Sequence, residues 1–183
     1  MFPPLHIINC VNDAIPVYPD WPVKGVQYKN TVELLKNPTA FGYSIDWFAT
    51  LARTIGARAI FAADARGFIW GSATARELAL PMHVVRKPGK LPGPVWSQEY
   101  ELEYGTDRLE LGHTDLNKES PVIIIDDVLA TGGTAEAICK LLHNNLGIGY
   151  SLMTVGVLIN LRFLGGENRL ASMGVKTHGL INE

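Results

Sequence analysis

The segment from Val122 to Thr134 constrains the fold of this chain more than any other stretch. It reads V-I-I-I-D-D-V-L-A-T-G-G-T. The run of β-branched residues predicts a buried strand, and the loop rich in Thr and Gly after it predicts a turn into a helix. Two acidic residues lie where we expect this strand to end. Because ligands of open α/β sheets bind beyond the carboxyl ends of the strands, the segment predicts a ligand site.

The residue types of this segment suit a phosphorylated sugar. A helix N-terminus offers free N–H groups and a positive dipole end to phosphate, and small residues let the backbone close around the anion. Carboxylates accept hydrogen bonds from ribose hydroxyls or bind a hydrated metal ion. The sequence contains neither G-x-x-x-x-G-K-[ST] nor G-x-G-x-x-G after a strand, so an NTPase loop and a dinucleotide site are not supported. The candidate residues are Asp126, Asp127, Ala130, Thr131, Gly132, Gly133 and Thr134.

Composition places the chain among globular proteins of one domain. Its 183 residues are 47% hydrophobic and 19% charged, with a net charge of −2, so neither a nucleic-acid partner nor a membrane surface is indicated. Cys10 and Cys139 form no disulfide framework, and no apolar run is long enough to span a membrane. We therefore expect a cytoplasmic location.

Alternating strand and helix patterns predict an α/β fold with a mostly parallel sheet flanked by helices. Residues 1–30 are rich in proline and are expected to be irregular, and Thr39 is a candidate helix cap. A long excursion over 86–111 contains a loop followed by strictly alternating residues, which predict a strand over 99–104 and a returning strand. We expect strands at 59–63, 82–85, 122–125 and 151–158, and helices at 41–55 and 71–80. The motif from Val122 and the helix after it occupy 122–146, and Gly147 is the expected stop of that helix.

A second strand end repeats the geometry of the first. The predicted strand 59–63 leads into Asp64, Ala65, Arg66 and Gly67, and a helix follows. Arg66 offers a planar fork to phosphate oxygens, and Gly67 permits close approach of the backbone. The alternative interpretation is an Arg–Asp pair on a surface turn. Two anion sites would suit a substrate with phosphate at one end and pyrophosphate at the other.

The excursion also carries candidate catalytic residues. Arg86, Lys87 and Lys90 lie in a stretch rich in Pro and Gly, which could close over a polyanion or could be an ordinary solvated basic loop. Glu103 shares a predicted strand face with Glu99 and Glu101. Such a face is usually solvated, so periodicity alone does not single out Glu103.

Several motifs together resemble the adenine branch of the type I phosphoribosyltransferases. They are D-A-R-G-F-I-W-G, R-K-x-G-K-L-P-G, Y-E-L-E-Y-G-T-D-x-L-E-L and the segment from 122 to 134, in that order. Asp20-Trp21-Pro22 and 25–30 resemble the base-binding hood of that family. The resemblance covers nearly the whole chain. It implies one domain over 1–183, with a hood in 1–30 and a mobile catalytic hairpin in 86–111.

The resemblance implies a role for each candidate residue. Residues 126–134 would bind the ribose and 5′-phosphate of phosphoribosyl diphosphate (PRPP), and the loop Asp64–Gly67 would bind pyrophosphate. Mg²⁺ would be held mainly by PRPP and water, with Asp126 and Asp127 as the candidate protein ligands. A homodimer is implied as well. The implied catalytic residues are Glu103, Arg86 and Lys87, and the implied base-binding residues are Val26, Gln27, Tyr28, Lys29 and Leu161.

The family reaction would form AMP and pyrophosphate from adenine and PRPP. Two alternatives remain open from the sequence, namely transfer to a 6-oxopurine and a regulator that binds PRPP without catalysis. Lys24 replaces the usual proline of the hood, Lys29-Asn30 replaces Arg-Asp, and Asn160 stands where an acid is common. Because lysine lacks the planar fork of arginine, these departures bear on which base is preferred.

Overall fold

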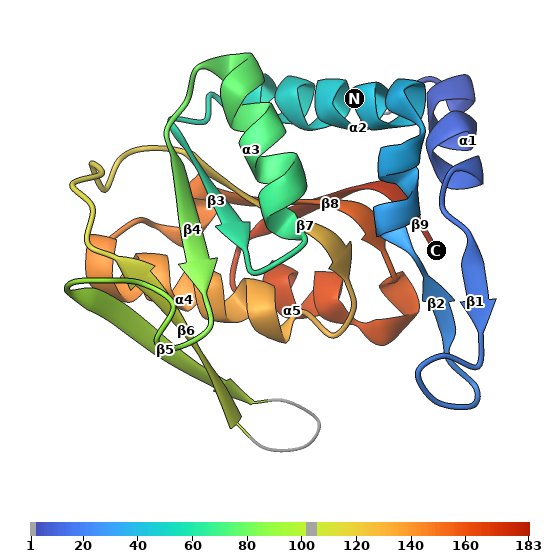
Figure 1. Cartoon of the computed structure of the whole chain (residues 1–183). Helices are drawn as coiled ribbons and strands as arrows, with labels where there is room; N and C mark the ends of the chain where they lie inside the picture. The colour runs from blue at the N-terminus through green and yellow to red at the C-terminus, as the bar shows by residue number, and fades with distance from the viewer. Residues whose placement is uncertain (1–2, 102–105) are drawn as a thin grey trace.

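A seven-stranded sheet forms the centre of the computed structural model, which describes residues 3–101 and 106–183 (Figure 1). The strand order is β5-β6-β4-β3-β7-β8-β9. Five neighbouring strands run parallel, namely β4, β3, β7, β8 and β9. Strand β6 of the β5–β6 hairpin pairs with β4 in antiparallel fashion. The strands are β3 (Ala59–Ala63), β4 (Met82–Arg86), β5 (Val95–Glu101), β6 (Thr106–Gly112), β7 (Val122–Leu129), β8 (Met153–Asn160) and β9 (Lys176–Asn182).

Helices cover both faces of this sheet, as the alternating sequence pattern predicts. One face carries α1 (Leu5–Asp13), α2 (Pro38–Thr54) and α3 (Gly67–Leu78), and the other carries α4 (Gly133–Leu146) and α5 (Gly166–Ser172). Short 3-10 helices connect these elements: η1 (Thr31–Lys36), η2 (Tyr150–Leu152) and η3 (Arg162–Leu164). In the described part of the chain, no helix combines the length and apolar character needed to cross a bilayer.

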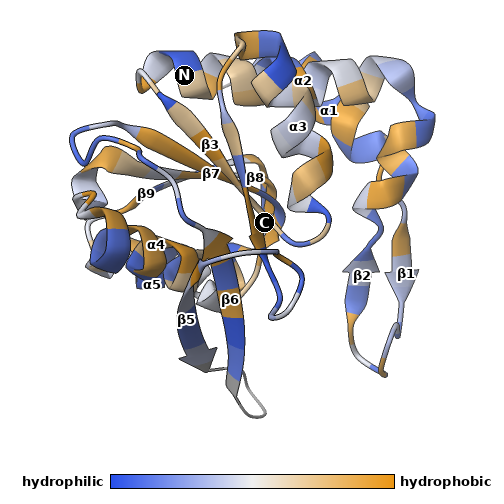
Figure 2. Cartoon of the chain, turned by 60° about the vertical axis from the view of Figure 1, so that its left-hand side comes forward, coloured by the Kyte–Doolittle hydropathy of each residue, from blue (hydrophilic) through white to orange (hydrophobic). Residues whose placement is uncertain are grey.

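The core divides into two layers because strand side chains alternate between faces. Ile60, Ile123 and Ile125 pack toward α1–α3, whereas Phe61 and Ile124 pack toward α4 and α5. Figure 2 shows the hydrophobic residues concentrated in the central strands and the hairpin strand β6 largely hydrophilic. Burial on both faces explains why the central strands are continuously apolar rather than alternating.

The first thirty residues are more regular than their prolines suggest. Instead of irregular chain, Leu5–Asp13 forms α1, whose residue Val11 is fully buried against the helical layer. Ile8, Val11 and Ile15 recur at helical spacing before the first of the clustered prolines, which is the signal that the expectation for 1–30 overlooked. The prolines follow in a separate antiparallel ribbon, the hood ribbon, made of β1 (Val17–Pro19) and β2 (Gln27–Lys29).

Other element boundaries also differ from the expectation. Asn37, not Thr39, caps α2, because its side chain accepts a hydrogen bond from the Ala40 N–H at 3.1 Å and Pro38 is the first helical residue. Strand β5 begins at Val95, inside the stretch expected to be a loop. The end of α4 at Gly147, with φ of 68°, is as predicted.

A close backbone approach joins α5 to the loop after β7. The Gly166 N–H donates to the Ala130 carbonyl at 3.1 Å, and a Cβ atom on Gly166 would lie only 2.3 Å from that oxygen and 2.9 Å from the Gly132 nitrogen. Only glycine permits this contact. The backbone at the start of α5 therefore contacts the loop at residues 130–132 and restricts its conformation.

We expect Gly166→Ala to lower the free energy of unfolding by about 1–3 kcal/mol, because the new methyl group must displace backbone atoms. Thermal denaturation measures the effect. Gly42→Ala is the matched control, since nothing lies within 4 Å of a Cβ atom there and Gly42 is exposed inside α2. This control should gain up to about 1 kcal/mol from helix propensity. A Gly166→Ala variant as stable as the wild type would contradict the close-approach argument.

Candidate functional site

Parallel pairing of β3 with β7 brings the two predicted anion sites together. Ala62 is aligned with Ile125, so both strands reach the same edge of the sheet and their following loops are neighbours. Gly67, at the start of α3, lies so close to β7 that a Cβ atom there would meet the Ile125 carbonyl oxygen at 2.6 Å. The absence of a side chain at this position allows the helix N-terminus to approach the acidic pair.

The loop after β7 forms a small pocket at the N-terminus of α4. Strand β7 continues to Leu129, so Asp126 and Asp127 lie inside the strand. The sequence had placed the two acids at its end. Gly132 has φ of 82°, and α4 begins at Gly133. A cavity of about 120 Å³ opens here. Its lining includes the candidate residues Asp126, Ala130, Thr131, Gly132, Gly133 and Thr134.

Asp127 is the most strongly held acid of the site. It is only 2% exposed, and its Oδ2 atom accepts hydrogen bonds from the Arg66 Nε group and from the Thr31 hydroxyl, the latter at 2.7 Å. Arg66 thus pairs with an acid, as one interpretation of its sequence context proposed, but the partner belongs to the neighbouring strand rather than to its own turn. The pair joins the two strand ends.

Asp126 has a different environment. Its Oδ1 atom accepts the Asp127 N–H at 2.8 Å. Burial raises the pKa of the Asp126 carboxyl well above its usual range, and the negative charge of Asp127 adds to this shift. No group of three or more His, Cys, Asp or Glu side chains gathers among the described residues, so a cation bound here would take few ligands from the protein.

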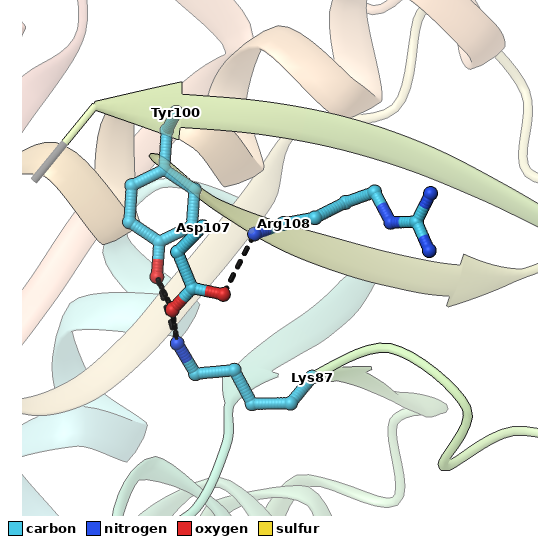
Figure 3. A network of polar contacts seen from close by, with 4 residues as sticks. All are labelled: Lys87, Tyr100, Asp107 and Arg108. Atoms are coloured by element: carbon cyan, nitrogen blue, oxygen red, sulfur yellow. Dashed lines mark hydrogen bonds and ion pairs between the residues drawn. The ribbon is translucent and has the colours of Figure 1, made fainter. Parts of the chain in front are cut away.

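The two basic residues at the end of β4, Arg86 and Lys87, are also paired with carboxylates. Arg86 Nε donates to Asp64 Oδ2 at 3.1 Å, and its guanidinium lies 5.7 Å from the centre of the Phe68 ring. Lys87 Nζ pairs with Asp107 and donates to the Tyr100 hydroxyl at 3.0 Å (Figure 3). The contacts of Lys87 therefore connect the end of β4 to Tyr100 of β5 and Asp107 of β6.

All three candidate pyrophosphate cations therefore have an internal counterion, and all three are accessible to a ligand. The side chains of Arg66, Arg86 and Lys87 are 44%, 32% and 43% exposed, respectively, whereas their carboxylate partners are more buried. Partly exposed cations over buried acids leave donors available to an incoming polyanion.

The base-binding candidates lie in two segments, one that contains β2 and one directly after β8. Tyr28 in β2 contacts Trp21 in the loop that joins β1 to β2, with ring centres 4.3 Å apart. Lys29 forms an ion pair with Glu183. The Glu183 backbone donates a hydrogen bond to the Asn160 carbonyl and accepts one from the Arg162 N–H, and these two residues flank Leu161. The hood ribbon is thus connected to the segment that contains Leu161. Gln27 in β2 and Val26 in the loop before it are exposed.

Glu103 lies outside the described residues, so the structure does not place it. Conversely, the structure identifies residues that the sequence patterns did not single out, namely Thr31, Tyr100, Asp107, Gly166 and Glu183. Thr31 contacts an acid 96 positions away. Local patterns carry no signal for such a pair, although the doublet Gly165-Gly166 could have indicated a close backbone approach.

Comparisons with known proteins agree with this geometry. A family model described as a phosphoribosyl transferase domain matches residues 30–146. The chain is 40% identical to the adenine phosphoribosyltransferase of Serratia proteamaculans over 96% of this chain and 87% of that protein. It resembles the crystal structure of the adenine phosphoribosyltransferase of Thermoanaerobacter pseudethanolicus, with a TM-score of 0.87, 38% identity, and coverage of 96% and 99%. The Saccharomyces cerevisiae structure, complexed with an imino-altritol bisphosphate and adenine, has a TM-score of 0.86, 28% identity, and coverage of 97% and 100%.

Removing the charge of Asp126 should stabilise the unliganded protein at neutral pH. For an acid whose pKa is raised in the folded state, ionisation destabilises the fold. This loss of stability is absent below the unfolded-state pKa and is complete above the folded-state pKa. Asp126→Asn keeps the acceptor for the Asp127 N–H and should raise Tm at pH 7.5, where each ~1 kcal/mol is worth roughly 2–4 °C in a chain of this size.

Differential scanning fluorimetry at pH 7.5 and pH 4.5 tests this prediction, and the gain should shrink at the lower pH. Asp46→Asn, at an exposed position of α2, is the control and should change Tm little. A gain of the same size at both pH values, or a lower Tm at pH 7.5, would disprove the assignment.

Proposed function

The chain belongs to the adenine phosphoribosyltransferase family, enzymes that form AMP and pyrophosphate from adenine and PRPP, and we propose that its two neighbouring strand ends divide the binding of PRPP between them. The observation that carries this proposal is the buried Asp127 carboxylate shared by Arg66 and Thr31, because it joins the predicted sugar site to the predicted pyrophosphate site. Asp126 and Asp127 accept the ribose hydroxyls. Residues 130–134 and the N-terminus of α4 bind the 5′-phosphate.

The pyrophosphate group lies against the loop Asp64–Gly67 and receives hydrogen bonds from Arg66, Arg86 and Lys87. In the reaction, the purine N9 atom forms a bond to the anomeric carbon while the bond from that carbon to pyrophosphate breaks. Negative charge grows on the departing oxygen, so cations that bind the product more tightly than the substrate lower the barrier. This requirement suits three cations that are each partly exposed.

The purine lies between the hood ribbon and the segment after β8. Tyr28 stacks on the base, Val26, Gln27 and Lys29 contribute from the same ribbon, and Leu161 lies on the other side. We propose Glu103 as the carboxylate that hydrogen-bonds the imidazole edge of the purine and takes part in proton transfer. The relatives described above are named adenine phosphoribosyltransferases. Their names favour adenine over a 6-oxopurine as the substrate, and an enzyme over a PRPP sensor.

Mg²⁺ is the proposed cofactor, and the acid pair fits it. Asp126 and Asp127 supply the oxygen ligands that Mg²⁺ prefers, and an ion that retains water and phosphate ligands needs no larger protein cage. When bound, the ion neutralises charge on the pyrophosphate. We also propose that the enzyme is a cytoplasmic homodimer. The family resemblance supports the dimer and the two free cysteines fit a reducing compartment. Sedimentation velocity tests the dimer.

Purified protein should release pyrophosphate from PRPP with adenine, and this activity should require Mg²⁺. Hypoxanthine, guanine and xanthine should react far more slowly, because a mismatched polar edge leaves a buried group unpaired. A coupled pyrophosphate assay with and without the metal makes the measurement. Tight PRPP binding without turnover on any purine would instead favour the sensor.

Asp127→Asn and Glu103→Ala should both reduce turnover severely, by about 10²-fold or more. Glu99→Ala is the matched control for Glu103, since Glu99 is an exposed acid of β5 in the same alternating sequence stretch, and it should retain nearly full activity. Circular dichroism checks that each variant is folded. Equal activity of Glu103→Ala and Glu99→Ala would refute the role of Glu103, and unfolding of Asp127→Asn would assign that acid a structural role.

A further inference from the structure

The Thr31 hydroxyl is a buried polar group at the base of the hood ribbon with a partner in the sugar site. Thr31 is the first residue of η1, only two positions after β2, and it is fully buried. Its hydroxyl donates to Asp127 Oδ2 at 2.7 Å. No role is assigned to Thr31 by the reaction described above, so this contact requires an explanation.

Two donors converge on the same oxygen atom, and only one of them can leave. Arg66 Nε also donates to Asp127 Oδ2, and the Arg66 side chain is 44% exposed, so it can turn toward a polyanion. Thr31 is fixed by its burial and cannot turn away. Among the described residues, none donates to the other oxygen, Asp127 Oδ1, which is free for a ligand.

We propose that Thr31 is a positioning residue that keeps the Asp127 carboxylate hydrogen-bonded when Arg66 moves onto pyrophosphate. An ionised carboxylate that is 2% exposed is costly to leave without a donor. The Thr31 hydroxyl removes that cost and thereby releases Arg66 for the substrate. It also fixes the orientation of the carboxylate, so Oδ1 stays directed away from the two donors. This inference rests on the proposed binding of PRPP.

The proposal distinguishes ligands that need Arg66 from those that do not. In a variant without the hydroxyl, Arg66 is the remaining donor to Asp127 Oδ2 among the described residues. A ligand with pyrophosphate must draw Arg66 away and leave that oxygen without a donor. AMP has no pyrophosphate group, and Arg66 can stay on Asp127 when AMP binds. The hydroxyl should therefore matter for PRPP and matter little for AMP.

Isothermal titration calorimetry in the presence of MgCl₂, without any purine, provides the test. Thr31→Val removes the hydroxyl at nearly constant volume and should weaken PRPP binding about tenfold, the loss expected for one hydrogen bond to a charged group. AMP binding should change by less than about twofold on the same physical ground. Thr31→Ser keeps the hydroxyl and should restore PRPP binding.

Thr74→Val is the matched control. Thr74 is also fully buried, but its hydroxyl has no hydrogen-bond partner in the described part of the chain, so this variant should bind PRPP like the wild type. The Tm of unliganded Thr31→Val should stay near that of Thr31→Ser, because Arg66 still satisfies Asp127. A steady-state comparison should show a raised KM for PRPP with an unchanged KM for adenine.

Three outcomes would overturn the inference: normal PRPP binding by Thr31→Val, equal weakening of PRPP and AMP, or failure of Thr31→Ser to rescue. Each can be observed while the wild type still binds PRPP and converts adenine, so the proposed function would stand. If the wild type itself neither binds PRPP nor turns over, the proposed function fails and this inference fails with it.

Discussion

A carboxylate buried between two strand ends is the interaction on which the proposed site depends. Asp127 is held by Arg66 from the loop after β3 and by Thr31 from the base of the hood ribbon. Because the acid is almost completely buried, its charge requires these donors. The same contacts connect β7, the loop after β3 and the base of the hood ribbon, where we propose that the sugar, the pyrophosphate and the base bind.

The ion pairs of the candidate site suit the proposed binding of a polyanion. Arg66, Arg86 and Lys87 each pair with a more buried carboxylate, on Asp127, Asp64 and Asp107, respectively. Each carboxylate offsets the charge of its cation in the folded protein. A polyanion with several charged oxygens competes with these pairs, so its binding free energy includes the cost of rearranging them. Asp126, whose pKa is raised by burial, is likewise held at a cost to stability.

The sequence predicted the parts of this architecture that follow from local patterns. Continuous apolar runs predicted the central strands, and helical spacing predicted α2 and α4. The excursion beginning at Arg86 was predicted to contain a returning strand, and the β5–β6 hairpin confirms it. The helix α1 was missed because the prolines after it dominated the interpretation of the first thirty residues. Sequence patterns describe spacing along the chain, so they identify elements better than their ends.

By itself, the sequence determined the chemistry of the proposed site. The acids followed by a Thr- and Gly-rich loop, the D-A-R-G turn and the basic stretch after β4 are local motifs, and each carries its meaning in residue type and spacing. Only the tertiary structure decided which side chains meet. Arg66 lies 61 residues from Asp127 and Thr31 lies 96 residues away, and Lys29 meets Glu183 across 154 residues. Such contacts depend on strand order and parallel register, which arise from packing of the whole sheet and leave no local trace in the chain.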